Sequence, residues 1–323
     1  MASIYILTSV RACEFGFRKK RSLFCFMGLS IDFLILMCYT CKRIIDIEGN
    51  DMKYKLIACD LDGTLLNSSV ELSSENKTAI TELVKKGVIF VPATGRSFYE
   101  TPASIREHPS IRYFISSNGS VIQDLKTGER FEFPVEGKKA DKIHAKMRKC
   151  NLLLAQHKNN HSLVDASRLG EDIMDEYKIP HHFRKQLREC TVHLENLDAE
   201  FSRGEPCEML SGCFKSTDQF NAFMNEISGI DGIHCTGAAS GIVEIVSTCA
   251  GKHNAIKFLI EKLGISKDEV ITVGDSRNDI EMIEFSPNSI AMANAIDELK
   301  EKAAHVGCTN DEHVAKYILE NFA

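Results

Sequence analysis

The sequence lacks the features that mark several specialised classes of protein. Its 323 residues contain no internal repeat and no low-complexity tract, and glycine and proline number 20 and 7. Collagen-like and disordered chains are therefore excluded. The twelve cysteines are irregularly spaced and include one Cys-x-x-Cys pair, Cys38–Cys41, so neither a disulfide scaffold nor a paired zinc site is predicted. We expect most cysteines to be reduced, small hydrophobic side chains.

Positive charge is also scarce over most of the chain. The net charge is −6, and residues 1–50 carry seven Lys and Arg against four Asp and Glu. Residues 51–323 therefore carry a net charge of −9, and they show no basic stripe with interleaved aromatic residues. Such an acidic body is a poor ligand for a phosphate backbone. We therefore expect no nucleic acid partner.

The first fifty residues differ from the rest. Residues 22–41 form an apolar run between basic residues, which is typical of a signal anchor or transmembrane helix. Asp32 lies within the run, where a carboxylate costs about 2.5–3.5 kcal/mol, and no small-residue cleavage site follows. Because Met52 directly precedes a strand pattern, residues 1–51 are interpreted as an extension from a misplaced start, with a membrane-associated tail or a soluble extension as alternatives. We expect a cytoplasmic protein, tethered to a membrane only if residues 22–41 are a genuine anchor.

From Lys53 onward, short apolar runs alternate with helical patterns. This alternation is typical of an α/β fold with a Rossmann-like parallel sheet. The expected strands are 55–60, 88–93, 112–116, 270–274 and 289–293. The expected helices are one that Ser73 or Ser74 caps and Gly87 terminates, and those at 252–263, 278–285 and 311–322.

Residues 130–240 lack this strand–helix rhythm. They contain helical patterns at 139–150 and 217–228 and a strand-like stretch at 207–214. We interpret this region as a smaller α+β domain that is inserted into the sheet domain.

Two carboxylates, Asp60 and Asp62, stand at the end of the first apolar run. Strand alternation would point both to the same side, unless the chain turns after Leu61, as Gly63 would permit. Neighbouring carboxylates repel each other, and a divalent cation would relieve the repulsion; magnesium prefers oxygen ligands. An isolated Asp-x-Asp could equally be a polar turn.

Further polar groups follow strand ends or open a helix. Thr94 follows the second strand and could cap a helix or present its hydroxyl to a phosphate. Asp275, Asn278 and Asp279 surround a turn after a later strand, where a cap and an acidic first turn explain only one aspartate. Lys252 lies near a helix start, where a cation is disfavoured unless an anion is close. Open α/β sheets bind ligands beyond the carboxyl ends of their strands, so these groups form one candidate site.

Taken in chain order, these motifs resemble those of the haloacid dehalogenase superfamily, and most closely its Cof-type phosphatases. The resemblance covers residues 53–323 and rests on DLDGTLL, ATGR, Asn118–Gly119 and GDSRNDIEM. It implies a magnesium-dependent phosphatase that acts on a small phosphorylated metabolite, such as a sugar phosphate or phosphorylated cofactor. It also implies a catalytic core formed by residues 52–119 and 244–323, and an α/β cap at 120–243 that closes over the site.

The resemblance further implies a role for each site residue. Asp60 is the nucleophile that forms an aspartyl-phosphate, and Asp62 is the general acid–base. The phosphate is bound by four residues: Thr94, Gly95, Lys252 and Asn278. Magnesium is bound by the Asp60 carboxylate, the main-chain carbonyl of Asp62, and Asp275. Asp279 and Asn118 are expected to support these groups.

Two positions depart from the family pattern. His253 stands where a glycine usually follows the lysine, which is expected to place a titratable group beside the phosphate site. Glu312–His313 stands where Asp-Gly is common. Neither change removes a catalytic group. Other histidines, including His181, His182 and His193, are expected to lie on the surface of the cap.

Three alternatives to a phosphatase stay open. A phosphomutase uses the same aspartyl-phosphate but returns the phosphoryl group to its substrate. A phospho-acceptor or binding module without turnover, such as a receiver domain, also joins an acidic cluster to Thr and Lys, although receiver domains lack the large insert. A membrane-tethered binding protein would use residues 22–41.

Overall fold

The computed structural model describes residues 53–236 and 241–323. Residues Met52–Ala323 form one unit by their internal contacts. Within the described ranges, none of the helices is long and apolar enough to cross a membrane. The apolar run at 22–41, the Cys38–Cys41 pair and the extension at 1–51 lie outside the described residues, so the expectations about them remain predictions.

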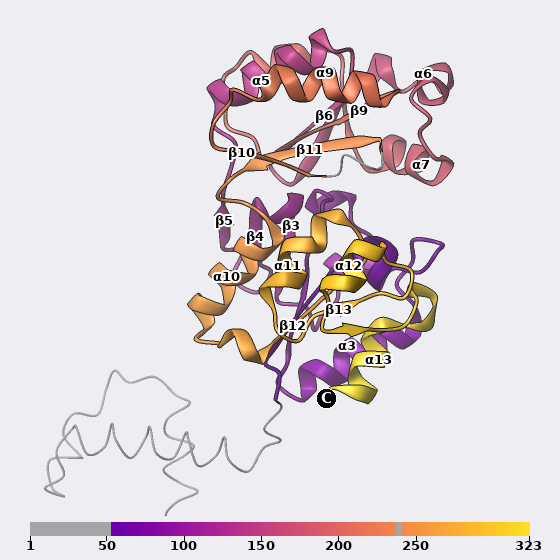
Figure 1. The fold of residues 1–323 in the computed structure, drawn as a ribbon, viewed down its shortest axis with the longest axis vertical. Coiled ribbons are helices and arrows are strands. Elements are labelled where there is room, and N and C mark those ends of the chain that lie inside the picture. The colour runs from indigo at the N-terminus through magenta and orange to yellow at the C-terminus, as the bar shows by residue number, and fades with distance from the viewer. Residues whose placement is uncertain (1–52, 237–240) are drawn as a thin grey trace, which may run out of the picture. The chain divides into compact units, whose positions relative to one another are not determined.

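The predicted strands at 55–60, 88–93, 270–274 and 289–293 lie in one five-stranded parallel sheet (Figure 1). The strand order is β14-β13-β12-β1-β2, and every neighbouring pair is parallel. The strands are β1 (Leu56–Cys59), β2 (Ile89–Pro92), β12 (Val270–Gly274), β13 (Ile290–Ala291) and β14 (His305–Val306). The predicted α/β class with a parallel sheet is confirmed, and β14 adds an edge strand that was not predicted.

Strand β1 lies between β12 and β2 and is buried on both faces. Ile57 and Cys59 pack in a cluster on one side of the sheet, and Leu56 and Ala58 pack in a cluster on the other. Parallel strands that are covered on both faces read as continuous apolar runs. This burial explains why the strand could be recognised without a polar–apolar alternation.

Helices cover both faces of the parallel sheet (Figure 1). They are α3 (Ser74–Lys85), α4 (Ala103–Arg106), α10 (Lys252–Leu263), α11 (Ile280–Phe285), α12 (Asp297–Lys302) and α13 (Val314–Asn321). Helices α3 and α13 contribute side chains to the cluster that contains Ile57, and α10 contributes to the opposite cluster. Ser73 accepts the N–H of Asn76 at the start of α3, and Gly87 follows its end with φ +91°, as predicted.

The predicted strand at 112–116 exists but does not lie within the five-stranded sheet. It is β3 (Tyr113–Ser116), which pairs antiparallel with β4 (Val121–Asp124), and β4 pairs with β5 (Arg130–Glu132). A single parallel bridge, Ala93–Ile115, links β3 to the end of β2. Ser117 and Asn118 adopt left-handed φ values of +49° and +50°, which fold the chain back into a hairpin.

The inserted region contains a six-stranded sheet of order β10-β11-β9-β6-β7-β8, whose pairs are antiparallel except β7–β8. Its strands are β6 (Leu153–Lys158), β7 (His161–Asp165), β8 (Val192–Leu194), β9 (Met209–Cys213), β10 (Ile233–Thr236) and β11 (Ile242–Ser247). Of these, only β9 was predicted. The predicted α+β character of the insert is confirmed.

Helices α5 and α9 run side by side on one face of this sheet (Figure 1), whereas α6 and α7 pack on the other face, against Leu153. The helices of the insert are α5 (Gly137–Lys149), α6 (Glu171–Glu176), α7 (His181–Glu189), α8 (Leu197–Phe201) and α9 (Thr217–Ile227). Ile143 of α5 and Phe223 of α9 share a buried cluster with Val243 and Ile245 of β11. The predicted boundary of the cap at residue 243 falls within β11, which continues to Ser247. This boundary and the one at 119 remain predictions.

Candidate active site

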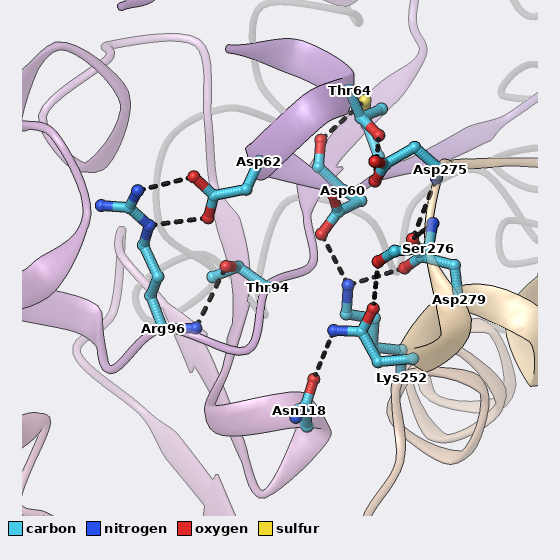
Figure 2. A network of polar contacts seen from close by, with 12 residues as sticks. Asp60, Asp62, Thr64, Thr94, Arg96, Asn118, Lys252, Asp275, Ser276 and Asp279 are labelled. Carbon is cyan, nitrogen blue, oxygen red and sulfur yellow. Dashed lines mark hydrogen bonds and ion pairs between the residues drawn. The ribbon is translucent and has the colours of Figure 1, made fainter. Parts of the chain in front are cut away.

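Three adjacent strands of the parallel sheet end in polar residues at the same edge. Asp60 follows β1 and donates its backbone N–H to Val273 O of β12 at 2.9 Å. Asp275 follows β12, and Thr94 follows β2. Since parallel strands direct their carboxyl ends to one edge, the side chains of these three residues gather there (Figure 2). The predicted grouping of these motifs is therefore observed.

Lys252 is the first residue of α10 and lies buried among carboxylates, with 2% of its surface exposed. Its Nζ is 2.6 Å from Asp60 Oδ1 and 2.7 Å from Asp279 Oδ1. Burial alone would lower the pKa of Lys252, but Asp279 and Asp60 outweigh burial and raise it. The side chain therefore remains an ammonium ion, and the two anions explain a cation at the positive end of a helix.

Negative charge still exceeds positive charge around this lysine. Burial raises the pKa of Asp60 well above its usual range, Lys252 opposes the shift, and the other aspartates reinforce it. Burial and Asp279 raise the pKa of Asp275 to about 7. Carboxylate oxygens of Asp60, Asp275 and Asp279 lie within 4.8 Å of one another. A set of hard oxygen donors with excess negative charge fits a divalent cation such as magnesium.

The three carboxylates differ in how far their oxygens are already engaged. Asp279 Oδ1 accepts from Lys252, and Oδ2 accepts the backbone N–H groups of Asp275 and Ser276 at 3.0 and 3.1 Å. Asp275 Oδ1 accepts from the hydroxyl of Thr64 at 3.3 Å. Asp279 thus braces the lysine and the turn after β12, whereas Asp60 and Asp275 are the better placed ligands for a metal.

The chain turns after Leu61, as the glycine at position 63 indicated. Gly63 has φ +74°, and a Cβ at this position would lie 2.4 Å from Asp275 Oδ2. The turn separates the two aspartates of the first motif. Asp60 faces Lys252, whereas Asp62 faces Arg96 (Figure 2).

Arg96 binds the carboxylate of Asp62 with two nitrogens. Its Nη2 and Nε lie 2.6 and 2.7 Å from the two oxygens of Asp62, and its Nη1 donates to the carbonyl of Glu100 at 3.0 Å. Arg96 is the last residue of the ATGR motif, but no role was predicted for it. Nothing in the sequence pairs it with Asp62, because the two residues lie on loops after different strands.

Thr94 and Gly95 form the loop after β2. The Thr94 hydroxyl accepts the N–H of Arg96 at 3.1 Å, and the Thr94 carbonyl accepts the N–H of Asn118 at 2.9 Å. A Cβ on Gly95 would lie 3.2 Å from Asn118 Oδ1 and 3.1 Å from Glu244 Oε1. A side chain at position 95 would therefore crowd these polar groups, which approach the loop backbone closely.

A row of side-chain hydrogen bonds links this loop to the turn after β12. Asn278 Nδ2 donates to Asn118 Oδ1 at 3.1 Å, and the Ser276 hydroxyl donates to Asn278 Oδ1 at 2.7 Å. Asn118 Nδ2 donates in turn to Glu244 Oε2 of β11 at 2.7 Å. Ser276 lies within the GDSRNDIEM motif but had no predicted role, and Glu244 lies in none of the motifs that the sequence offered.

The two departures from the family pattern have separate surroundings. His253 Nδ1 lies 3.0 Å from Glu281 Oε2 of α11, and burial lowers the pKa of His253 against the influence of that carboxylate. His313 adopts φ +65°, in the left-handed region that favours glycine. His181 and His193 are exposed, as expected.

Comparisons with known proteins agree with this geometry. Residues 57–318 match the model of a family described as haloacid dehalogenase-like hydrolase. A 5-amino-6-(5-phospho-D-ribitylamino)uracil phosphatase of Bacillus subtilis, YwtE, is 27% identical over 82% of this chain and 97% of its own length. A second such phosphatase of that organism, YcsE, is 29% identical over 85% of this chain and 98% of its own.

A solved structure shows the same fold. A haloacid dehalogenase-like hydrolase from B. subtilis superposes with a TM-score of 0.73 and 26% identity, covering 83% of this chain and all of that one. The predicted Cof-type resemblance and the prediction of a phosphatase are confirmed by these matches. The chain belongs to the family of haloacid dehalogenase-like hydrolases.

Proposed function

We propose that this phosphatase is magnesium-dependent and hydrolyses a small phosphorylated metabolite through an aspartyl-phosphate on Asp60. The observation that carries the proposal is the buried ammonium of Lys252, which bridges Asp60 and Asp279 at the carboxyl edge of the sheet. Such a cation beside a nucleophilic carboxylate can hold a phosphoryl oxygen while the carboxylate attacks phosphorus.

The first half of the reaction transfers the phosphoryl group to the protein. An oxygen of Asp60 attacks phosphorus, and the bond from phosphorus to the leaving oxygen breaks. Asp62 donates a proton to that oxygen, so an alcohol departs. Lys252, the Thr94 hydroxyl, Gly95 and Asn278 hold the phosphoryl oxygens.

The second half releases phosphate. A water molecule attacks the phosphorus of the aspartyl-phosphate, and Asp62 takes its proton. The bond between Asp60 and phosphorus breaks, which regenerates the carboxylate and completes two in-line displacements. Asn118 and Asp279 support the site, since they hold Asn278 and Lys252 respectively.

Magnesium would be held by the carboxylates of Asp60 and Asp275 and by the main-chain carbonyl of Asp62. When bound, it supplies positive charge that offsets the negative charge on the phosphoryl oxygens. The raised pKa of Asp60 and that of Asp275, at about 7, support this assignment, because both carboxylates lack sufficient compensating charge from the protein.

The substrate class is a small phosphorylated metabolite, such as a sugar phosphate or phosphorylated cofactor. Two relatives that match almost over their whole length are named for a phosphorylated ribitylamino compound, which supports this class. Glu244, one residue beyond the proposed cap, belongs to β11 of the six-stranded sheet and bonds to Asn118 of the site. The sheet therefore reaches the site, and we propose that the cap at 120–243 selects the leaving group while residues 52–119 and 244–323 form the core.

The test is phosphate release by the full chain from a panel of phosphorylated metabolites, with and without magnesium. We expect turnover that EDTA abolishes and magnesium restores. Asp60→Asn should lower turnover roughly a thousandfold or more while the circular dichroism spectrum stays unchanged. Asp231→Asn, at an exposed position, is the matched control and should keep wild-type turnover.

Other outcomes would favour the alternatives. Product isomerisation without phosphate release would identify a phosphomutase. A stable aspartyl-phosphate without turnover would indicate a phospho-acceptor module. Undiminished turnover in Asp60→Asn would rule out the proposed mechanism.

A further inference from the structure

Glu244 brings a carboxylate from the six-stranded sheet to the loop that Thr94 and Gly95 form after β2. Its Oε2 accepts from Asn118 Nδ2 at 2.7 Å and from the Thr236 hydroxyl at 3.3 Å. Its Oε1 lies 3.1 Å from the point where a Cβ on Gly95 would stand. Within residues 53–236 and 241–323, no hydrogen bond engages Oε1, so a ligand beside the loop would displace none of the described donors from this oxygen.

Strand alternation fixes this orientation. The neighbouring side chains Val243 and Ile245 are fully buried in the cluster beneath α5 and α9. Successive side chains of a strand point to opposite faces, so Glu244 stands on the face of the sheet that is turned away from those helices. A carboxylate held there by two donors is positioned by the fold and is not a solvated surface group.

The residues in line with Glu244 across the sheet are small and uncharged. The register places Thr236, Ser211 and then Ala155 in line with Glu244, on β10, β9 and β6 respectively. All four are partly exposed. Small side chains leave room for a leaving group next to the carboxylate, and this row contains no Lys or Arg that could pair with a second anion.

The charge balance of the site also favours a leaving group without a negative charge. The side chains described above comprise five carboxylates, those of Asp60, Asp62, Asp275, Asp279 and Glu244, against the two cations Lys252 and Arg96. A divalent cation would still leave one negative charge in excess before the substrate binds. A leaving group with its own anionic group would add repulsion near Glu244, whereas hydroxyl groups could donate to Oε1.

We propose that Glu244 is a specificity-determining residue that selects phosphomonoesters of neutral, polyhydroxylated leaving groups and rejects leaving groups that carry a carboxylate or second phosphate. This inference rests on the proposed function. In the bound state, a hydroxyl of the leaving group donates to Glu244 Oε1, while Oε2 keeps its bonds to Asn118 and Thr236.

The test compares two substrates that differ in one group. The 6-phosphates of sorbitol and gluconate carry the same hydroxylated chain but end in a hydroxymethyl group and a carboxylate. The specificity ratio is kcat/KM for the first divided by kcat/KM for the second. It is measured for the wild-type chain, Glu244→Gln and Glu195→Gln, with Glu195 being an exposed residue of the insert.

We expect a wild-type ratio of about ten or more that falls at least severalfold in Glu244→Gln and is kept in Glu195→Gln. Glutamine retains an acceptor for Asn118 and loses only the charge. A ratio taken within one preparation does not depend on the fraction of folded protein, so a merely structural role of Glu244 would leave it unchanged.

The failures are distinguishable. An unchanged ratio in Glu244→Gln, with both substrates hydrolysed, would overturn the inference and leave the proposed function standing. Hydrolysis of p-nitrophenyl phosphate but of neither sugar derivative would also overturn the inference. No magnesium-dependent phosphate release from any of these compounds would overturn the proposed function, and the inference with it.

Discussion

Arg96 holds both carboxylate oxygens of Asp62, at 2.6 and 2.7 Å, across the loops that follow β1 and β2. The arginine side chain is only 9% exposed, whereas that of Asp62 is 40% exposed. A carboxylate in a bidentate pair with a guanidinium has both of its oxygens engaged as acceptors. In the proposed mechanism, Asp62 must therefore exchange Arg96 for the leaving oxygen of the substrate.

The role of Asp62 can be tested with leaving groups of different basicity. In Asp62→Asn, transfer to Asp60 should slow about a hundredfold or more for alkyl phosphates, which need a protonated leaving group. It should slow far less for p-nitrophenyl phosphate, whose leaving group departs as an anion. Rapid-quench measurement of phosphoenzyme formation checks this difference. Equal losses for both kinds of substrate would argue against Asp62 as the acid.

Removing the buried ammonium should destabilise the fold. Lys252→Met leaves Asp60 and Asp279 buried without their cation, which we expect to lower the free energy of unfolding by about 3–5 kcal/mol near neutral pH. Lys257→Met replaces an exposed lysine of the same helix and should have little effect. Urea denaturation of both variants provides the measurement.

The loss in Lys252→Met should also depend on pH. Lys252 is the group that opposes the raised pKa of Asp60, so its removal raises that pKa further. The folded state then holds a proton that the unfolded state has released, and stability falls as pH rises. We therefore expect the deficit to shrink when the pH is lowered from 8 to 5.5. A deficit that is constant over this range would contradict an uncompensated buried charge.

Alanine variants of two glycines with positive φ can distinguish the effect of backbone strain from the effect of a change at the site. Gly63 has φ +74° and lies against Asp275, whereas Gly87 has φ +91° and no atom within 4 Å of a built Cβ. Alanine at either position should destabilise the chain by about 1 kcal/mol. Only Gly63→Ala should also raise the magnesium concentration needed for half-maximal activity. Equal magnesium titrations of the two variants would show that the Gly63 turn does not position the Asp275 carboxylate.

His108 should make the fold less stable in mild acid. Its Nδ1 accepts the N–H of Ser110 at 3.2 Å, and its Nε2 lies 3.3 Å from the carbonyl of Lys77. Burial lowers the pKa of His108 below 6.5, against the influence of that carbonyl. Below pH 6.5 the unfolded chain therefore binds a proton before the folded chain, and stability falls as pH decreases.

The variant His108→Asn keeps an acceptor for Ser110 but cannot titrate. We expect its free energy of unfolding to fall less steeply than that of the wild type between pH 7 and pH 5. Chemical denaturation at several pH values measures the two slopes. Identical slopes would mean that His108 does not contribute to acid sensitivity.

The centre of the site could be predicted because its residues stand at the ends of recognisable strands. Asp60, Thr94 and Asp275 each follow an apolar run, and parallel strands necessarily bring their ends to one edge. Lys252 at a helix start required a nearby anion, and the structure places two there. The positions of these residues at strand ends and at a helix start therefore sufficed to predict this part of the site.

The remaining parts depend on contacts that the sequence does not encode locally. The Asp62–Arg96 pair joins two loops. Glu244 lies between two apolar residues, a pattern that is typical of any polar residue on the outer face of a strand. The strand at 112–116 was assigned to the wrong sheet because the reversal at Ser117 and Asn118 uses left-handed non-glycine residues. Strand β6 escaped prediction because its polar residues Gln156 and His157 are buried.

The ion pair between Asp60 and Lys252 joins residues 192 positions apart. During synthesis, the ribosome therefore produces Asp60, the Thr94 loop and the whole insert before Lys252 emerges. Until then, the carboxylate at the end of β1 has no counter-charge and is better hydrated than buried. Because β12, the neighbour of β1, also follows α10 in the chain, we expect the parallel sheet to close around β1 only late in synthesis.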